Sequence, residues 1–354
     1  MRRNLLVVAF SLTMLTSSIQ TANAGLNAPI DLNNSRVVPI FHLWNSGTSG
    51  FAGGSGYLYS SRIVLTAAHG NYSFEKNGNR VLKEPPAIMV GQPNSSAKDL
   101  NGRVKVIKTF VGDYKLGSYF GGLNDFIVYV LEKDLAIMKP SKLLTVEIKR
   151  ELVQSQAQVT FHGYGEYRDR CAPNEKTPCT RNWDDPNYRT SEFPRKSNIN
   201  LAPLSAFPWI PQQALTELGD EVLVSNHNAC PGDSGGPITT TYKDEEIYLG
   251  QGLNGAFVYA CGAGVTKAQN NDAQSFGQFS PVHKHLDLIT QAEAFVLTKI
   301  ASENASQVAK TTAVKLGSKC LQKNKVFVSG KTKLICLPNK KILTWQIQQP
   351  TIKR

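Results

Sequence analysis

The segment from Gly232 to Pro237 reads Gly-Asp-Ser-Gly-Gly-Pro and has the residues of a nucleophile turn. A serine hydroxyl is a weak nucleophile until a neighbouring base removes its proton. The glycines beside Ser234 let the backbone turn so that amide N–H groups face the oxygen that becomes negative when a carbonyl is attacked. A glycine-rich turn with an incidental serine is the alternative, but this hexapeptide is much more specific than a Gly-x-Ser-x-Gly pattern.

A base and an acidic partner for it occur upstream. His69 ends the apolar segment Leu65–Ala68, and Asp125 opens the segment Phe126–Leu131. Each is ordinary by itself, since a histidine after an apolar strand is commonly structural and an aspartate can cap a turn. The chain order of these two residues and Ser234, however, is a known order of a catalytic triad. We therefore predict that Ser234 attacks a carbonyl, His69 takes and returns the proton, and Asp125 orients the imidazole.

Short segments rich in β-branched or aromatic residues surround these positions and are separated by Gly, Asn and Pro. They span residues 37–43, 63–65, 104–111, 126–131, 158–162, 221–224 and 247–250. So many short strands favour a sandwich or barrels. Apolar residues at spacings of three, four and seven predict one helix from Val282 to Ile300, although Glu293 interrupts its apolar stripe.

Several motifs resemble those of chymotrypsin-like (trypsin-family) serine endopeptidases. They are Gly53–Gly56, Thr66–His69, Asn124–Ile127, Phe161–Gly165 and Gly232–Pro237. The resemblance covers residues 37–290 and implies an all-β fold of two antiparallel six-stranded β-barrels with a C-terminal helix, with the active site between the barrels. It also implies hydrolysis of peptide bonds in protein or peptide substrates through an acyl-enzyme intermediate.

The same resemblance gives roles to the residues around the nucleophile. The N–H groups of Gly232 and Ser234 would form the oxyanion hole, and Asp233 would pair with a newly formed α-amino group. No Ile-Val-Gly-Gly start is present, and Gly25 lies 13 residues before Val38 in the first barrel strand. Our hypothesis is that removal of the signal peptide itself creates the activating terminus at Gly25.

The resemblance also places Asn228, Gly255 and Gly277 in the specificity pocket. A trypsin-like enzyme has an aspartate at the position of Asn228, and an amide cannot neutralise a Lys or Arg side chain. The two glycines keep the pocket open to a large side chain. We therefore expect cleavage after apolar, aromatic or uncharged polar residues rather than strict Lys or Arg specificity.

Composition and charge divide the chain. It has 354 residues, is 41% hydrophobic and carries a net charge of +12, which excludes collagen-like or broadly disordered proteins. The first 24 residues have the basic, apolar and small-residue succession of a signal peptide, so we expect a secreted or periplasmic protein without an integral membrane segment. The chain beyond residue 290 carries +10, and the body before it is balanced. We predict a protease domain at 25–300, a linker at 301–316 and a small basic module at 317–354.

In an exported chain the six cysteines can form disulfide bonds, and fifteen pairings are possible. Nearest-neighbour pairing would join Cys171 to Cys179, Cys230 to Cys261 and Cys320 to Cys336. The family resemblance implies the second of these bonds, which would brace the specificity pocket. Cys171 and Cys179 belong to an insertion at 166–200, which we interpret as a surface loop near the cleft rim that could narrow access for folded substrates.

The module at 317–354 has a β-type sequence with many lysines. Its predicted strands are Lys325–Val328, Lys333–Leu337 and Ile342–Trp345, with turns at Ser329–Gly330 and Pro338–Asn339. So small a unit buries little apolar surface, and a bond between Cys320 and Cys336 would supply the missing constraint. The module is either a solvated basic appendage or a surface that binds an anionic polymer, such as an envelope polymer or nucleic acid, near Trp345.

Other function classes receive less support. A catalytically silent secreted binding protein on the same fold is the alternative, but such proteins usually lack a triad member. A nucleic-acid-binding enzyme finds support only in the basic module. We expect no cofactor, no metal site and a monomer. Four histidines outside the triad lack matched ligands and are interpreted as structural or exposed: His162, His227, His283 and His285.

Overall fold

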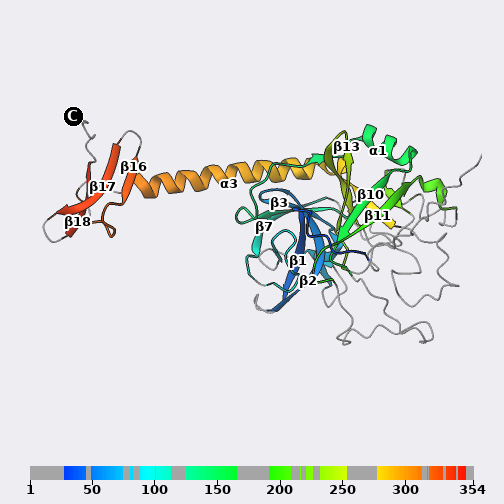
Figure 1. Ribbon diagram of the computed structural model, residues 1–354, viewed down its shortest axis with the longest axis horizontal. Helices are drawn as coiled ribbons and strands as arrows, with labels where there is room; N and C mark the ends of the chain where they lie inside the picture. Colours follow the sequence, from blue (N-terminus) through cyan, green and yellow to red (C-terminus); the bar gives the residue numbers. More distant parts are fainter. Residues whose placement is uncertain are drawn as a thin grey trace, which may run out of the picture.

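The computed structural model describes two barrels, a long helix and a small C-terminal sheet (Figure 1). The described residues are 28–44, 49–74, 80–82, 88–99, 101–112, 124–165, 191–208, 216, 221–225, 232–252, 277–312, 317, 319–329, 332–339 and 342–347. Several predicted features lie outside them: the signal segment, Gly25, the insertion at 166–190, His227, Asn228, Gly255, and the cysteines Cys171, Cys179, Cys230 and Cys261.

Six strands close the first barrel. In order around it they are β1 (Val37–Trp44), β2 (Ser49–Ser60), β3 (Ile63–Thr66), β8 (Ile127–Leu131), β7 (Val104–Val111) and β6 (Ile88–Val90). Neighbouring strands pair antiparallel. Every residue of β3 and β8 is buried, as expected for strands of β-branched and aromatic residues inside a closed sheet. The strands β4 (Tyr72–Phe74) and β5 (Arg80–Leu82) form a separate hairpin.

The second barrel is also six-stranded and antiparallel. It consists of β10 (Gln158–Gly163), β11 (Arg195–Ala202), β12 (Leu223–Ser225), β15 (Gly277–Pro281), β14 (Glu245–Gly252) and β13 (Pro237–Tyr242). The strand β13 pairs with both β10 and β14, which closes the sheet. The short β9 (Lys142–Leu143) joins β14 in parallel. The predicted two-barrel fold is therefore confirmed.

One buried cluster joins the barrels. Leu65 and Phe126 of the first barrel belong to the same core as Phe161 and Phe279 of the second. The short helices lie around this core: η2 (His69–Asn71), α1 (Val146–Gln154), η3 (Leu204–Ala206) and η5 (Val282–Lys284). Because the barrels share a core, side-chain packing fixes their relative position in addition to the covalent connection between them.

The helix α3 spans Leu286–Thr312, so it begins later and ends later than the sequence predicts. Val282 lies in η5, and the predicted linker at 301–316 is helical up to Thr312. Glu293, which interrupts the apolar stripe, accepts a hydrogen bond from the Tyr59 hydroxyl of β2 at 2.9 Å. The helix packs on the first barrel and then runs clear of it (Figure 1). No helix in the described part of the chain has both the length and the apolar character needed to cross a bilayer.

The C-terminal sheet has the order β16 (Val326–Ser329), β17 (Thr332–Asn339) and β18 (Ile342–Ile347). The structure contains the disulfide Cys320–Cys336, as nearest-neighbour pairing predicts. The turn predicted at Pro338–Asn339 is wrong, because both residues pair with β18. Pro338 is tolerated there because the register of β16 ends at Ile335, and no ladder partner needs its missing N–H.

Candidate active site

The barrels bring His69, Asp125 and Ser234 together. The antiparallel ladder between β3 and β8 pairs Thr66 with Ile127, so the end of one strand lies beside the start of the other. His69 follows β3 and Asp125 precedes β8, which makes them neighbours although they are 56 positions apart in the sequence. Ser234 lies in the turn before β13 of the second barrel and is within hydrogen-bond distance of His69 of the first barrel.

The three side chains form a hydrogen-bonded chain. Asp125 Oδ2 lies 2.6 Å from His69 Nδ1, and His69 Nε2 lies 2.8 Å from Ser234 Oγ. Asp125 Oδ1 also accepts the backbone N–H of His69 at 2.7 Å. Because the carboxylate can only accept, His69 Nδ1 is the donor, and Nε2 is left to accept the serine proton.

Burial and the neighbouring charge have opposite effects on the pKa of the His69 imidazole. Burial of His69 lowers its pKa, whereas the charge and the hydrogen bond of Asp125 raise it, and the net result is a pKa above the ordinary value. Asp125 is wholly buried, while the His69 side chain keeps 21% of its surface exposed toward the cleft. A proton taken from Ser234 would therefore be stabilised on His69 by the adjacent carboxylate.

Ser55 of β2 holds the nucleophile turn from the first barrel. Its backbone N–H donates to Ser234 O at 2.9 Å, and its hydroxyl donates to Gly232 O at 3.1 Å. Gly235 has a positive φ of 78°, and a side chain there would overlap Thr66 and the Ser55 backbone. Only glycine fits this close approach of two barrels. The sequence points to Ser55 through the motif Gly53–Gly56, without giving it a role.

The predicted oxyanion residues lie in the same turn. Gly232 has a φ of 91°, a conformation that favours glycine. Within the described part of the chain, no group accepts a hydrogen bond from the N–H of Gly232 or Ser234. These two donors are therefore available to a negative oxygen near Ser234.

Asp233 points away from the nucleophile into the second barrel. It is 2% exposed, and its Oδ1 accepts the N–H of Gly165 at 2.7 Å. Side chains at Gly163 or Gly165 would overlap its carboxylate, which explains both glycines of the Gly-Tyr-Gly segment. Ala28 lies near the same strand end, because Arg195, paired with Gly163, donates a hydrogen bond to Ala28 O.

Of the three predicted pocket residues, only Gly277 lies in the described part. It is the first residue of β15 and pairs with Ser225 of β12, and its position is buried.

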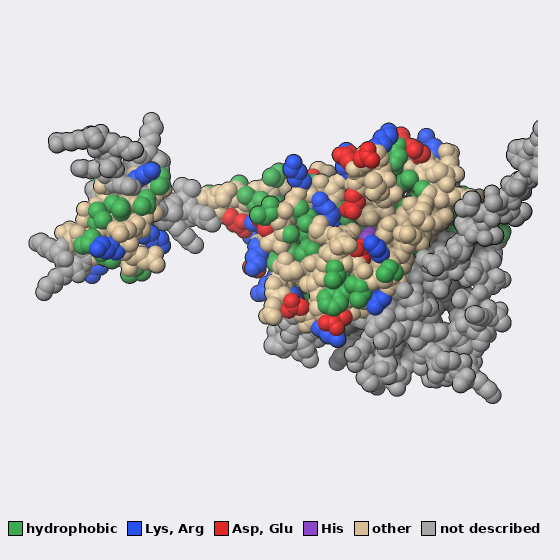
Figure 2. All heavy atoms as spheres, in the orientation of Figure 1, with side chains coloured by type: hydrophobic (Ala, Val, Ile, Leu, Met, Phe, Trp, Pro, Cys, Tyr) green, Lys and Arg blue, Asp and Glu red, His purple; other side chains and the backbone are tan. Residues whose placement is uncertain are grey.

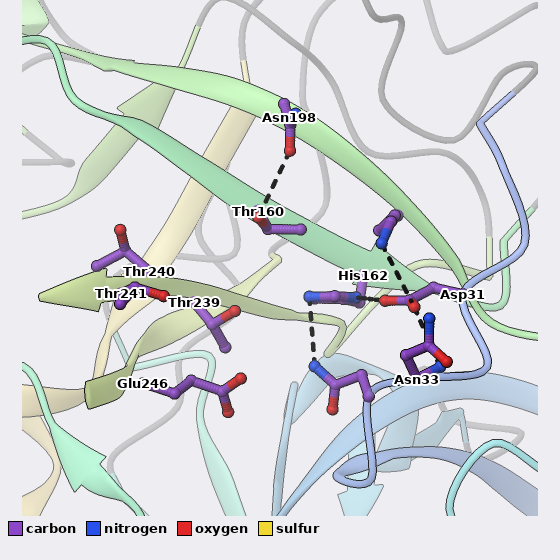
Figure 3. A pocket seen from close by; sticks show the side chains of 11 residues that line it. Asp31, Asn33, Thr160, His162, Asn198, Thr239, Thr240, Thr241 and Glu246 are labelled. Carbon is purple, nitrogen blue, oxygen red and sulfur yellow. Dashed lines mark hydrogen bonds and ion pairs between the residues drawn. The ribbon is translucent and has the colours of Figure 1, made fainter. Parts of the chain in front are cut away.

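A polar depression of about 370 Å³ lies on the second barrel (Figure 3). It is lined by hydroxyl and amide side chains around a buried ion pair between Asp31 and His162, whose Oδ2 and Nδ1 lie 3.2 Å apart. The hydrogen bond from His162 is the main cause that lowers the pKa of Asp31 to about 2. None of the triad residues lines this depression. His162 is therefore buried and paired rather than exposed.

His283 and His285 are structural. His283 Nε2 lies 3.2 Å from Glu221, and burial lowers the pKa of His283. His285 stacks on Phe126 with ring centroids 4.3 Å apart and lies 2.8 Å from Ser280 Oγ. Among the described residues, no group of three or more His, Cys, Asp or Glu side chains is arranged to hold a metal ion.

Two closed antiparallel barrels with a buried shared core are the architecture of chymotrypsin-like proteins. The family model described as Trypsin matches residues 40–289, more than two thirds of the chain. The chain therefore belongs to the trypsin family. No curated protein matches it.

Proposed function

We propose that the protein is a secreted serine endopeptidase that uses His69, Asp125 and Ser234. The observation that carries the proposal is the hydrogen-bonded chain from Asp125 through His69 to Ser234, at 2.6 and 2.8 Å. The predicted signal peptide and the Cys320–Cys336 disulfide both fit an oxidising compartment outside the cytosol.

The chemistry follows from the direction of these hydrogen bonds. Ser234 Oγ attacks the scissile carbonyl carbon while its proton moves to His69 Nε2, and Asp125 stabilises the imidazolium. The carbonyl oxygen becomes negative and is bound by the N–H groups of Gly232 and Ser234. His69 then protonates the leaving amine as the C–N bond breaks, leaving an acyl-enzyme. A water molecule hydrolyses this ester by the same steps, with His69 again as base and then acid.

Labelling with an alkyl fluorophosphonate separates this proposal from a catalytically silent binding protein. An activated serine displaces fluoride and becomes phosphonylated, so we expect one adduct, located on Ser234 by mass spectrometry. Ser234→Ala should abolish the adduct and lower turnover of a peptide substrate by about 10⁶-fold. A folded wild-type protein that neither reacts nor hydrolyses peptides would support the silent binding protein instead.

Substrate preference is proposed from the pocket residues. With Asn228 at the base and glycines at 255 and 277, we expect uncharged side chains before the cleaved bond. Digestion of a peptide library and sequencing of the products tests this. Cleavage confined to Lys and Arg would show that Asn228 is not at the base of the pocket.

We also propose that signal-peptide removal activates the enzyme. Ala28 lies at the strand end whose glycines contact Asp233, and Gly25 is only three residues earlier. A three-residue extended segment spans up to about 10 Å, and this length supports contact between an amine at Gly25 and the Asp233 carboxylate. N-terminal sequencing of active protein should start at Gly25. A start at Val37, or full activity of a chain extended before Gly25, would contradict this route.

The basic module is proposed to bind an anionic polymer. Residues 317–354 contain nine Lys or Arg and no Asp or Glu. On the face drawn in Figure 2, the C-terminal sheet shows blue and green side chains and no red ones, whereas the barrels show both charges. Electrostatic binding of this kind weakens as salt rises.

A chain ending at Thr312 keeps α3 and removes the module. We expect unchanged hydrolysis of a short peptide and loss of retention on an anionic matrix at low salt. The matched control retains the sheet and replaces four exposed lysines with glutamine: Lys319, Lys323, Lys325 and Lys333. Equal retention of the full chain, the truncated chain and the lysine variant would show that the module does not bind the matrix and is a solvated appendage.

A further inference from the structure

Gln251 connects the strand that holds the nucleophile turn to the strands that carry His69 and Asp125. It lies in β14 of the second barrel and is wholly buried. Its Nε2 donates hydrogen bonds to two backbone carbonyls of the first barrel, those of Thr66 and Asp125, the second at 3.1 Å. Thr66 ends β3 three residues before His69, and Asp125 is the triad carboxylate itself.

The orientation of this amide is fixed by its partners. Both first-barrel partners are carbonyl oxygens, which can only accept, so the NH₂ group must face them. Gln251 Oε1 accepts the Tyr248 hydroxyl at 3.1 Å. The Tyr248 ring stacks on Tyr57 of β2 with centroids 4.4 Å apart, and Tyr57 donates to Glu246 at 3.0 Å. Rotation of the amide would place its oxygen against two carbonyl oxygens and break both of these hydrogen bonds in a buried site.

The backbone next to Gln251 holds the nucleophile turn. Gly252 N donates to Gly236 O at 2.8 Å, and Gly235 N donates to Gly252 O at 2.9 Å. Gly235 and Gly236 directly follow Ser234. The segment 251–252 therefore contacts the backbone near all three triad residues. The Gln251 side chain binds the strands next to His69 and Asp125, and the Gly252 main chain binds the turn that holds Ser234.

We propose that Gln251 is a positioning residue, which sets the His69–Asp125 pair relative to Ser234; the inference rests on the proposed function. Ser55 already fixes the backbone of Ser234 from the first barrel. Gln251 supplies the reciprocal contact, from the second barrel to the strands of the base. Since a misplacement of about 1 Å can cost about 100-fold in rate, loss of this contact should act mainly on kcat.

Gln251→Leu tests the proposal because leucine is apolar and of similar size, and it removes both donors. We expect kcat/KM for a short peptide to fall about 10- to 100-fold, with most of the loss in kcat. Asp125 raises the pKa of His69, so a looser Asp125–His69 contact should move the acid limb of kcat/KM to lower pH. Tyr248→Phe keeps the amide but removes its anchor, and it should shift the same limb less.

A loss of packing alone must be separated from a loss of positioning. Ile247→Ala, at another buried position of β14, should lower the Tm and leave the acid limb in place. If Gln251→Leu does not fold, Tyr248→Phe decides. A wild-type acid limb and wild-type kcat in the folded variant would overturn the proposal.

A second readout does not need activity. In a Ser234→Ala background, the proton NMR resonance of His69 Nδ1–H reports the contact with Asp125. We expect Gln251→Leu to shift or broaden this resonance and Ile247→Ala to leave it unchanged. An unshifted resonance overturns the role of Gln251, whereas a wild-type protein that fails to label with fluorophosphonate overturns the proposed function.

Discussion

The barrels and the C-terminal sheet are stabilised in different ways. The largest buried cluster draws residues from both barrels and from α3, and many large side chains in it are fully buried. Among its described residues, the C-terminal sheet has a cluster of four buried residues, and two of these are the cysteines of the Cys320–Cys336 bond. Apolar burial organises the described part of the barrels, whereas the small apolar cluster of the sheet is supplemented by a covalent constraint. Mutations in the barrels should therefore change peptide hydrolysis without unfolding the C-terminal sheet, and mutations in the sheet should change its stability without changing hydrolysis.

Asp125→Asn should give the largest effect and confine it to the barrels. Asp125 accepts both the Nδ1–H and the backbone N–H of His69, but an amide has only one accepting oxygen and cannot replace both contacts. We therefore expect kcat to fall about 10⁴-fold. The charge of Asp125 raises the pKa of His69, so the acid limb of any residual activity should move to lower pH. A pH series of kcat/KM measures both effects. An acid limb that stays in place would show that another group titrates there.

Replacing both Cys320 and Cys336 by alanine should affect the sheet and spare the barrels. The bond closes a loop with a sequence separation of 16, which corresponds to about 3 kcal/mol in the chain-entropy model. Hydrogen exchange of the strands β16–β18 should become fast, while hydrolysis of a short peptide stays at the wild-type rate. Slow exchange in the variant would show that the apolar cluster around Trp345 is sufficient.

Asp31→Asn should lower the free energy of unfolding of the barrels by an amount that depends on pH. The folded pKa of Asp31, about 2, lies below its ordinary value of 3.8, so its stabilisation is present above pH 4 and is lost as the pH falls toward 2. We expect a loss of about 1 kcal/mol at pH 7, after allowance for solvent screening, and a smaller loss near pH 2. Urea unfolding at both pH values measures it. An equal loss of unfolding free energy at both pH values would show that the contact with His162 is not the cause.

Glu303→Gln should give the smallest effect. Glu303 pairs with Arg62 of the first barrel at 3.1 Å, and the Arg62 guanidinium lowers the pKa of this carboxylate. Both partners are partly exposed and screened by solvent, so the loss in stability should be the smallest of the four. Hydrogen exchange of α3 after Leu297 should increase without a change in the barrels. A loss of stability larger than that of Asp31→Asn would mean that the end of α3 contributes to the barrel core.

The sequence predicts the strands well where local patterning and burial agree. The limits of β7 are those that its run of β-branched residues indicates, and β1, β3 and β10 differ by one residue. The helix α1 was not predicted, because it is short and polar and buries only Leu152. The end of α3 was missed because small polar residues are compatible with a helix as well as with a linker.

The candidate site divides in the same way. The triad positions can be inferred because each lies within a short motif. The role of Gln251 cannot, because its partners Thr66 and Asp125 lie 185 and 126 positions away, and nothing in its neighbouring residues indicates them. The pair of Asp31 and His162 is hidden for the same reason. Polar contacts between barrels depend on three-dimensional register, which a local pattern does not encode.

The length of α3 has a consequence for tethered proteolysis. A helix of 27 residues is about 40 Å long, and Figure 1 places the barrels near one end and the sheet at the other. A flexible chain of that length would sample a broad range of separations around about 30 Å. A helical spacer narrows this range. If the sheet binds an anionic polymer as we propose, the candidate active site is held within a narrow range of distances from the attachment point. Its effective concentration is then high at those distances and low elsewhere.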